Sequence, residues 1–154
     1  MKAKYLILFL ISILVFSLGL GCSKAETDIE EKYISKTKII LLAIADNKEQ
    51  LNEAFDAYIN GKISSSVFDK RAEIYVEKVK IYYDKYLEIK PPKKFEKAHE
   101  IFGKGMKHLS KSVIFFQNFI DTNDEKYVPL FEAEEDLAMG YLSEAVELMD
   151  KLTE

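Results

Sequence analysis

Residues 66–92 read SVFDKRAEIYVEKVKIYYDKYLEIKPP, and this stretch decides the fold expected of the 154-residue chain. Its apolar side chains recur at intervals of four and three residues: Phe68, Ala72, Tyr75, Val79, Tyr82, Tyr86 and Ile89. Such spacing places them on one face of an α-helix, whereas a strand would alternate. Pro91 and Pro92 end the helix, because a residue before proline avoids helical backbone angles. A helix with one long apolar face needs other helices to cover it.

Three further segments show helical periodicity. Residues 29–60 carry one apolar face with a polar residue within it: Tyr33, Thr37, Ile40, Ile44, Asn47, Leu51, Ala54 and Tyr58. The segment that begins at Pro92 carries Phe95, Ala98, Phe102, Leu109, Val113, Phe116 and Ile120. The last segment begins near Thr122 and carries Leu130, Leu137, Tyr141, Ala145, Leu148 and Leu152. Short connections predict antiparallel packing, so the expected fold is all-α: an up-down-up-down four-helix bundle after an N-terminal signal helix.

Local signals suggest where these helices begin and end. Gly61 predicts the end of the first helix, because glycine accepts the left-handed conformation. Ser66 and Thr122 each precede an acidic residue by three positions, as in a capping box. Pro129 is expected to kink the start of the last helix or to split off a short turn.

Two glycines lie in the middle of the third helix. Gly103 and Gly105 each cost about 1 kcal/mol there relative to alanine. We expect them either to let a neighbouring helix approach closely or to create a bend.

The first 21 residues have the plan of an export signal. Lys2 and Lys4 precede an apolar run from Tyr5 to Leu20, and small residues follow it. As a helix, this run of 16 residues would be about 24 Å long, which is short of the roughly 30 Å hydrocarbon core of a membrane. A leader that is removed is therefore favoured over a permanent membrane span.

The residues that follow the run, Leu18-Gly19-Leu20-Gly21-Cys22, resemble the lipobox of bacterial lipoproteins. This resemblance implies that Cys22 carries diacylglycerol and that the chain is cut between Gly21 and Cys22. Gly19 departs from the pattern, which prefers leucine at that position. Two alternatives stay open: cleavage after Ala25, which would release a secreted soluble helical protein, or an uncleaved anchor.

The expected organisation follows from this cleavage site. Residues 1–21 are the lipoprotein signal peptide, residues 22–28 are the lipidated cysteine and a short polar tether, and residues 29–154 are the bundle domain. The expected location is the cell membrane, with the body lipid-anchored on the extracytoplasmic side. Cys22 is the single cysteine of the chain, so an internal disulfide is excluded.

The charge balance limits the possible partners. Removal of the leader leaves 20 basic and 26 acidic side chains, a net charge of −6. An acidic body does not favour nucleic acid, because phosphates call for a basic face. It also gains nothing from anionic lipid headgroups, so the lipid on Cys22 is the expected attachment to the membrane.

Glu96 and His99 form the strongest candidate for a metal site. The spacing Glu-x-x-His puts both side chains on one side of a helix, as in di-iron four-helix proteins, which use the motif twice. Here it occurs once, and the competing interpretation is a glutamate near the positive end of a helix. His108 lies 2.5 turns from His99, on the opposite side of the helix.

Tyr75, Tyr82 and Tyr86 are candidate ligand-facing residues. Tyrosine suits such grooves because it offers an apolar ring and a hydroxyl tip. The interpretation we favour is that the three rings lie at the core boundary with their hydroxyls facing water. The acidic run over residues 132–136 is likewise expected to be a solvated face.

The pattern of residues 89–99, IKPPKKFEKAH, resembles a turn of small, uncharacterised helical lipoproteins. The resemblance implies no activity. Nucleophile motifs, a glycine-rich phosphate loop and His-Glu-x-x-His are missing from the sequence, so we expect no enzyme and no cofactor. The expected function is a lipid-anchored extracytoplasmic helical module that binds an unknown envelope protein or ligand; a metal-binding bundle built on Glu96 and His99 is the alternative.

Overall fold

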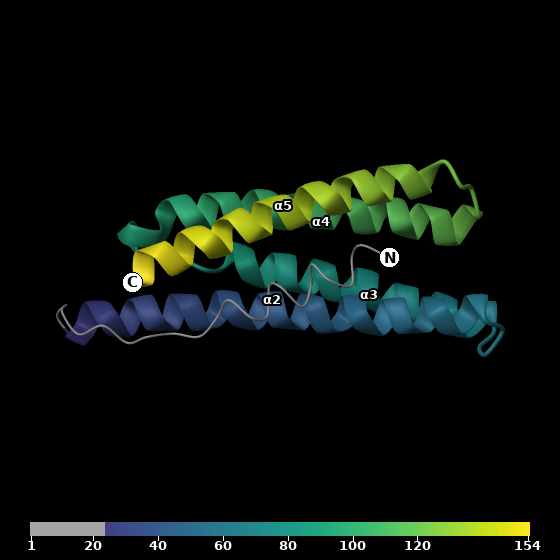
Figure 1. The fold of residues 1–154 in the computed structure, drawn as a ribbon, viewed down its shortest axis with the longest axis horizontal. Coiled ribbons are helices and arrows are strands. Elements are labelled where there is room, and N and C mark those ends of the chain that lie inside the picture. The colour runs from purple at the N-terminus through teal and green to yellow at the C-terminus, as the bar shows by residue number, and fades with distance from the viewer. Residues whose placement is uncertain (1–23) are drawn as a thin grey trace.

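The computed structural model describes residues 24–154, which form four long helices (Figure 1). They are α2 (Lys24–Ile59), α3 (Ser65–Leu87), α4 (Glu96–Thr122) and α5 (Tyr127–Thr153), with a short 3-10 turn, η1 (Lys93–Phe95), before α4. This part of the chain contains no strand. Successive helices run in opposite directions, and the predicted all-α, up-down-up-down bundle is confirmed.

The helices follow one another around the bundle in chain order. α2 packs against α3, α3 against α4, and α4 against α5. Residues of α2 and α5, among them Ile34 and Val146, line a common narrow cavity, which closes the ring. α3 and α5 therefore occupy diagonally opposite corners and run in the same direction (Figure 1).

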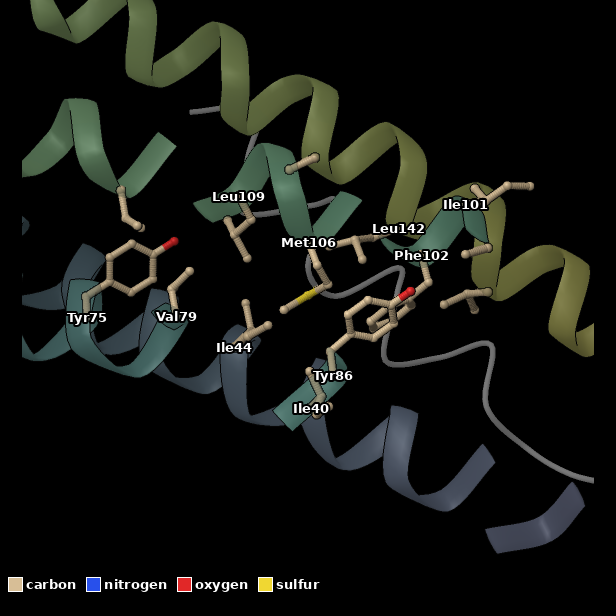
Figure 2. Packing of buried hydrophobic residues seen from close by; sticks show 14 of the residues in the cluster. Ile40, Ile44, Tyr75, Val79, Tyr86, Ile101, Phe102, Met106, Leu109 and Leu142 are labelled. Atoms are coloured by element: carbon tan, nitrogen blue, oxygen red, sulfur yellow. The ribbon is translucent and has the colours of Figure 1, made fainter. Parts of the chain in front are cut away.

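The core lies along the axis of the bundle and is filled from all four helices (Figure 2). Phe95, Phe102, Met106 and Val113 are fully buried. Most of the predicted apolar faces of α2, α3 and α4 are buried as expected. Asn47, the polar residue in the α2 face, donates a hydrogen bond from Nδ2 to the Ala43 carbonyl at 2.5 Å, so its amide is satisfied within its own helix.

The predicted face of α5 was partly wrong. Leu130 and Leu137 are 44% and 48% exposed. The buried residues of this helix are Ala138, Leu142, Ala145, Val146 and Met149. α5 buries this face because its two alanines let the helix lie close against α4, whereas leucines at the contact would hold the helices apart.

Two glycines of α4 allow this close packing. A Cβ added to Gly105 would lie 2.7 Å from Leu142 Cγ and 3.1 Å from the Ala138 carbonyl oxygen. A Cβ on Gly103 would lie 2.5 Å from the Tyr86 hydroxyl oxygen. Of the two predicted roles, close approach of neighbouring helices is therefore the one that the contacts support.

The first helix begins earlier than the sequence suggested. α2 starts at Lys24, so most of the predicted tether, residues 22–28, is helical. Lysine, alanine and glutamate are strong helix formers, and this stretch contains all three. Helical propensity therefore lets α2 begin several residues before its apolar face does.

Both predicted capping boxes were wrong. α3 is preceded by Ser64, whose side chain makes no capping hydrogen bond. Thr122 is the last residue of α4, and its hydroxyl donates to the Asn118 carbonyl at 2.6 Å. Asn123 follows as the C-terminal cap of α4, and its φ of 52° is left-handed. Pro129 lies within the first turn of α5, where a helix needs no backbone N–H.

Candidate functional site

The structure separates the three candidate tyrosines. Tyr75 and Tyr86 are 1% and 5% exposed, so both lie deeper than the core boundary. Tyr82 is half-buried and faces the space between α2 and α3. The three rings do not line one common groove.

Tyr82 belongs to an open groove between α2 and α3 with a volume of about 280 Å³. Ile39, Ile40 and Ile89 supply its apolar surface, and Lys36, Lys85 and Glu88 supply its charges. The Lys85 ammonium lies over the Tyr82 ring, 5.1 Å from its centre. A surface of this kind suits an apolar side chain or a short apolar segment with polar flanks.

Tyr75 belongs to a polar cluster near the middle of the bundle. Lys48 Nζ of α2 donates to Glu135 Oε1 of α5 at 2.6 Å, and their side chains are only 15% and 20% exposed. The same ammonium lies 5.5 Å from the centre of the Tyr75 ring and 4.8 Å from that of Phe131. A small apolar cavity of about 40 Å³ adjoins the cluster, so there is room for a water molecule but not for an organic ligand.

Burial is the main reason that the pKa of Tyr75 is raised well above 10, and the neighbouring Glu135 carboxylate raises it further. An ionised Tyr75 would lie in an apolar environment beside a negative charge. Tyr75 therefore stays neutral beside Glu135, and its buried ring packs α3 into the core.

The sequence interpretation missed this cluster. Glu135 was assigned to a solvated acidic run, and Lys48 was not singled out. A usable signal was present: Lys48 follows Ile44 by four residues and precedes Leu51 by three, which places it on the apolar side of α2.

Glu134 departs from the solvated-face interpretation as well. Its Oε2 lies 2.6 Å from His108 Nδ1, and its Oε1 lies 3.7 Å from Lys111 Nζ. The His108 ring stacks on Tyr141 with 5.5 Å between centres. Only Glu132 and Asp136 of the four acidic residues are exposed, because the other two face α2 and α4.

His99 lies in an aromatic cluster at the end of the bundle where α2 begins. Its ring is 4.7 Å from that of Tyr86 and 5.8 Å from that of Tyr33, centre to centre. The Tyr33 hydroxyl is 3.3 Å from His99 Nδ1, and the Tyr86 hydroxyl donates to the His99 carbonyl at 2.8 Å. Burial lowers the pKa of His99 and raises that of Tyr33 to about 12.

The metal alternative finds no third ligand in residues 24–154, where no group of three or more His, Cys, Asp or Glu side chains is placed to hold an ion. Glu96 is exposed at the first position of α4. His99 Nδ1 is instead engaged by Tyr33. Glu96 therefore begins α4, and His99 packs within the aromatic cluster.

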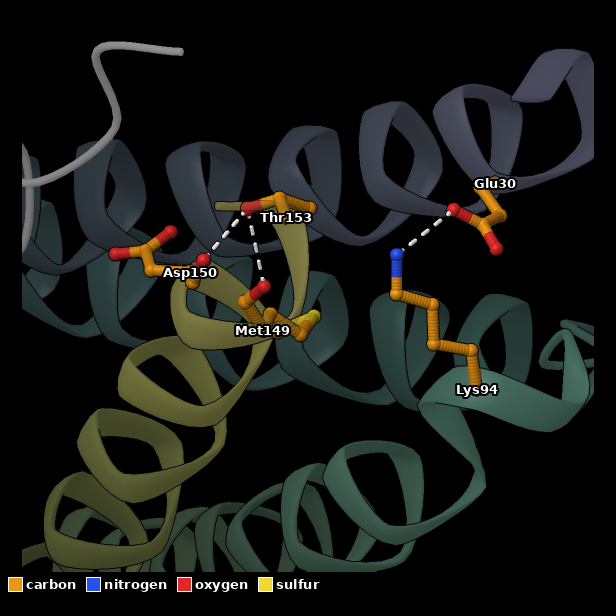
Figure 3. A network of polar contacts seen from close by, with 5 residues as sticks. All are labelled: Glu30, Lys94, Met149, Asp150 and Thr153. Atoms are coloured by element: carbon orange, nitrogen blue, oxygen red, sulfur yellow. Dashed lines mark hydrogen bonds and ion pairs between the residues drawn. The ribbon is translucent and has the colours of Figure 1, made fainter. Parts of the chain in front are cut away.

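Polar contacts hold the end of the bundle where α2 begins (Figure 3). Lys94 Nζ of η1 lies 3.4 Å from Glu30 Oε2 of α2. At the end of α5, the Thr153 hydroxyl donates to the carbonyls of Met149 and Asp150. Asp150 Oδ2 is buried without a hydrogen-bond partner, and burial raises the pKa of this carboxyl.

The predicted cleavage and lipidation residues, Gly21 and Cys22, lie outside the described residues, as does the leader before them. Within residues 24–154, none of the helices combines the length and the apolar character that crossing a bilayer requires.

Comparisons with known proteins return nothing that matches: no family model, no curated protein and no solved structure resembles this chain at a significant level.

Proposed function

We propose that this chain is a lipid-anchored helical interaction module on the extracytoplasmic side of the cell membrane, without enzymatic activity. The observation that carries the proposal is the order of its N-terminal residues: a basic start, an apolar run, and Leu18-Gly19-Leu20-Gly21-Cys22. Removal of the leader makes Cys22 the first residue, and acyl chains on it hold the protein to the bilayer at about 0.8 kcal/mol for each buried CH₂.

The start of α2 fits this arrangement. α2 begins at Lys24, two residues after Cys22, so at most about 7 Å of chain separates the two Cα atoms. The anchored end of the bundle is then the one formed by the start of α2, η1 and the end of α5. The groove between α2 and α3, with Ile39 and Tyr82, remains open to a partner.

The test is the chemical state of the mature N-terminus. The full chain is expressed in a bacterium, and its first peptide is examined by mass spectrometry. A diacylated Cys22 at the N-terminus is expected, together with partitioning into the detergent phase. The Cys22→Ala variant should lose the lipid and the detergent partitioning.

Ser23→Ala is the matched control, because it changes the neighbouring residue and keeps the thiol. An unmodified cysteine, a mature chain that starts at Glu26, or a Cys22→Ala variant that is equally membrane-bound would contradict the proposal.

A further inference from the structure

α3 carries an exposed stripe that does not serve the core. The side chains at successive intervals of four and three residues are all exposed: Val67, Arg71, Ile74, Lys78, Ile81 and Lys85. Its three apolar members are 45%, 42% and 37% exposed. The stripe therefore alternates apolar and basic residues, and Arg71 is the single arginine of the chain.

α5 carries a second exposed stripe of opposite charge. Leu130 and Leu137, which leave the core because α5 buries its small-residue face, are 44% and 48% exposed. Asp136, Glu144 and Glu147 are exposed beside them and further along the same outward side. This α5 stripe is apolar in its first half, and its second half carries Glu144 and Glu147 before the exposed Lys151 at its end.

The two stripes point away from each other. α3 and α5 lie at diagonal corners of the bundle and run in the same direction. Their outward faces cannot meet within one molecule, but each is available to a neighbouring copy. A contact between different faces of identical subunits repeats without closing, unless a rotation brings the last copy back to the first.

We propose that copies of this protein associate side by side, with the α3 stripe of one copy against the α5 stripe of the next. In parallel register, Val67 and Ile74 come opposite Leu130 and Leu137, with the same interval of seven residues on each helix. Lys78 and Lys85 then face the half of α5 that carries Glu144 and Glu147.

Charge disfavours the symmetric contacts. Two α3 stripes would bring Arg71, Lys78 and Lys85 against their own copies, and two α5 stripes would do the same with Glu144 and Glu147. Like charges directly opposed disfavour association. The mixed contact joins opposite charges and covers the exposed leucines and isoleucines of both helices.

The proposed lipid anchor adds to this inference, which rests on it for the orientation of the copies. Anchoring by one end holds all copies upright in the same sense, so that parallel α3 and α5 helices can meet. It also confines them to two dimensions, which raises their effective concentration.

Cross-linking of the full chain in its membranes tests the contact. The double variant Ile74→Cys/Leu137→Cys should give a ladder of dimers, trimers and larger species on mild oxidation. Each single variant should give no product above that of the wild type. Equal products from either single variant, or no ladder from the double variant, would overturn the proposal.

Charge reversal provides the second arm. Lys78→Glu/Lys85→Glu in the double-cysteine protein should reduce the ladder about fivefold, because it replaces attraction by repulsion at two positions. Adding Glu144→Lys/Glu147→Lys should restore it. Helical content by circular dichroism checks that each variant is folded, and a ladder unchanged by reversal would count against the α3–α5 contact.

The wild type separates this proposal from lipid anchoring. Cys22 is the single cysteine of the wild type, so an oxidised wild-type dimer would show that the Cys22 thiol is free. That outcome would contradict the lipidation of Cys22, but it would not contradict the α3–α5 contact. A cross-link of the double variant to a foreign protein in place of a ladder would assign the stripes to another partner and reject self-association.

Discussion

At the scale of the residue, His99 shows that a spacing compatible with metal binding can also belong to a packed aromatic cluster. The Glu96–His99 spacing was compatible with a metal, but the Tyr33 and Tyr86 rings enclose the imidazole, and Tyr33 contacts its Nδ1 atom. The tyrosines that surround His99 come from α2 and α3, and no pattern within α4 could have identified them.

We predict that His99 stays neutral to a lower pH than a free histidine. Burial lowers its pKa below the ordinary value of 6.5, because the charged form loses hydration. The part of the free energy of unfolding that depends on a neutral His99 is fully present above pH 6.5. It is lost as the pH falls through the lower pKa of the folded state.

Proton NMR of the full chain in micelles measures this directly. The chain has 2 histidines, and the His99→Gln variant identifies the ring resonance of His99. A midpoint at or above 6.5 would contradict the prediction. The free energy of unfolding of His99→Gln should also depend less on pH below 6.5 than that of the wild type.

At the scale of the element, the sequence predicted the helices well and their ends poorly. Periodicity identified most of the buried residues of α3 and α4, because burying the longest apolar face of a helix removes the most apolar surface from water. The helix starts predicted at Ser66 and Thr122 were wrong, because the capping-box pattern matches many short polar sequences. Leu130 and Leu137 were wrongly assigned to the core face of α5. The helix instead buries Ala138 and Ala145, and the close approach of Ala138 depends on Gly105 of α4.

We predict that Gly105→Ala destabilises the bundle by about 1–3 kcal/mol, because the new methyl group meets both Leu142 and the backbone of Ala138. Gly140→Ala is the matched control within α5. A Cβ there has nothing within 4 Å, so alanine should stabilise the helix by about 0.5–1 kcal/mol. Urea unfolding followed by circular dichroism measures both, and equal effects of the two variants would refute the packing argument.

At the scale of the whole molecule, the proposed lipid on Cys22 would give the bundle an attached end and a free end. The all-α architecture was accessible from sequence, since short connections between amphipathic helices leave few alternatives. The Lys48–Glu135 ion pair was not, because its two residues are 87 positions apart in the sequence. Pairing between distant charges depends on the rotation of α2 and α5 about their own axes, which cannot be predicted from the sequence.

We predict that a fluorophore near η1 is quenched more strongly by lipid-borne quenchers than one at the opposite end. Lys93→Cys places the label in η1, beside the proposed anchor, and Lys62→Cys places it in the turn between α2 and α3. The labelled lipidated protein is measured in vesicles. Equal quenching at both positions would mean that the bundle lies flat on the membrane.

The early start of α2 has a mechanical consequence. A continuous helix of 36 residues is about 54 Å long, and it begins two residues after Cys22, the proposed attachment point. The bundle would then project from the bilayer, and the short connection would limit its movement relative to the membrane. An anchored protein of this kind would meet its partners within that height, and molecules on the same membrane surface would be the ones nearest to it.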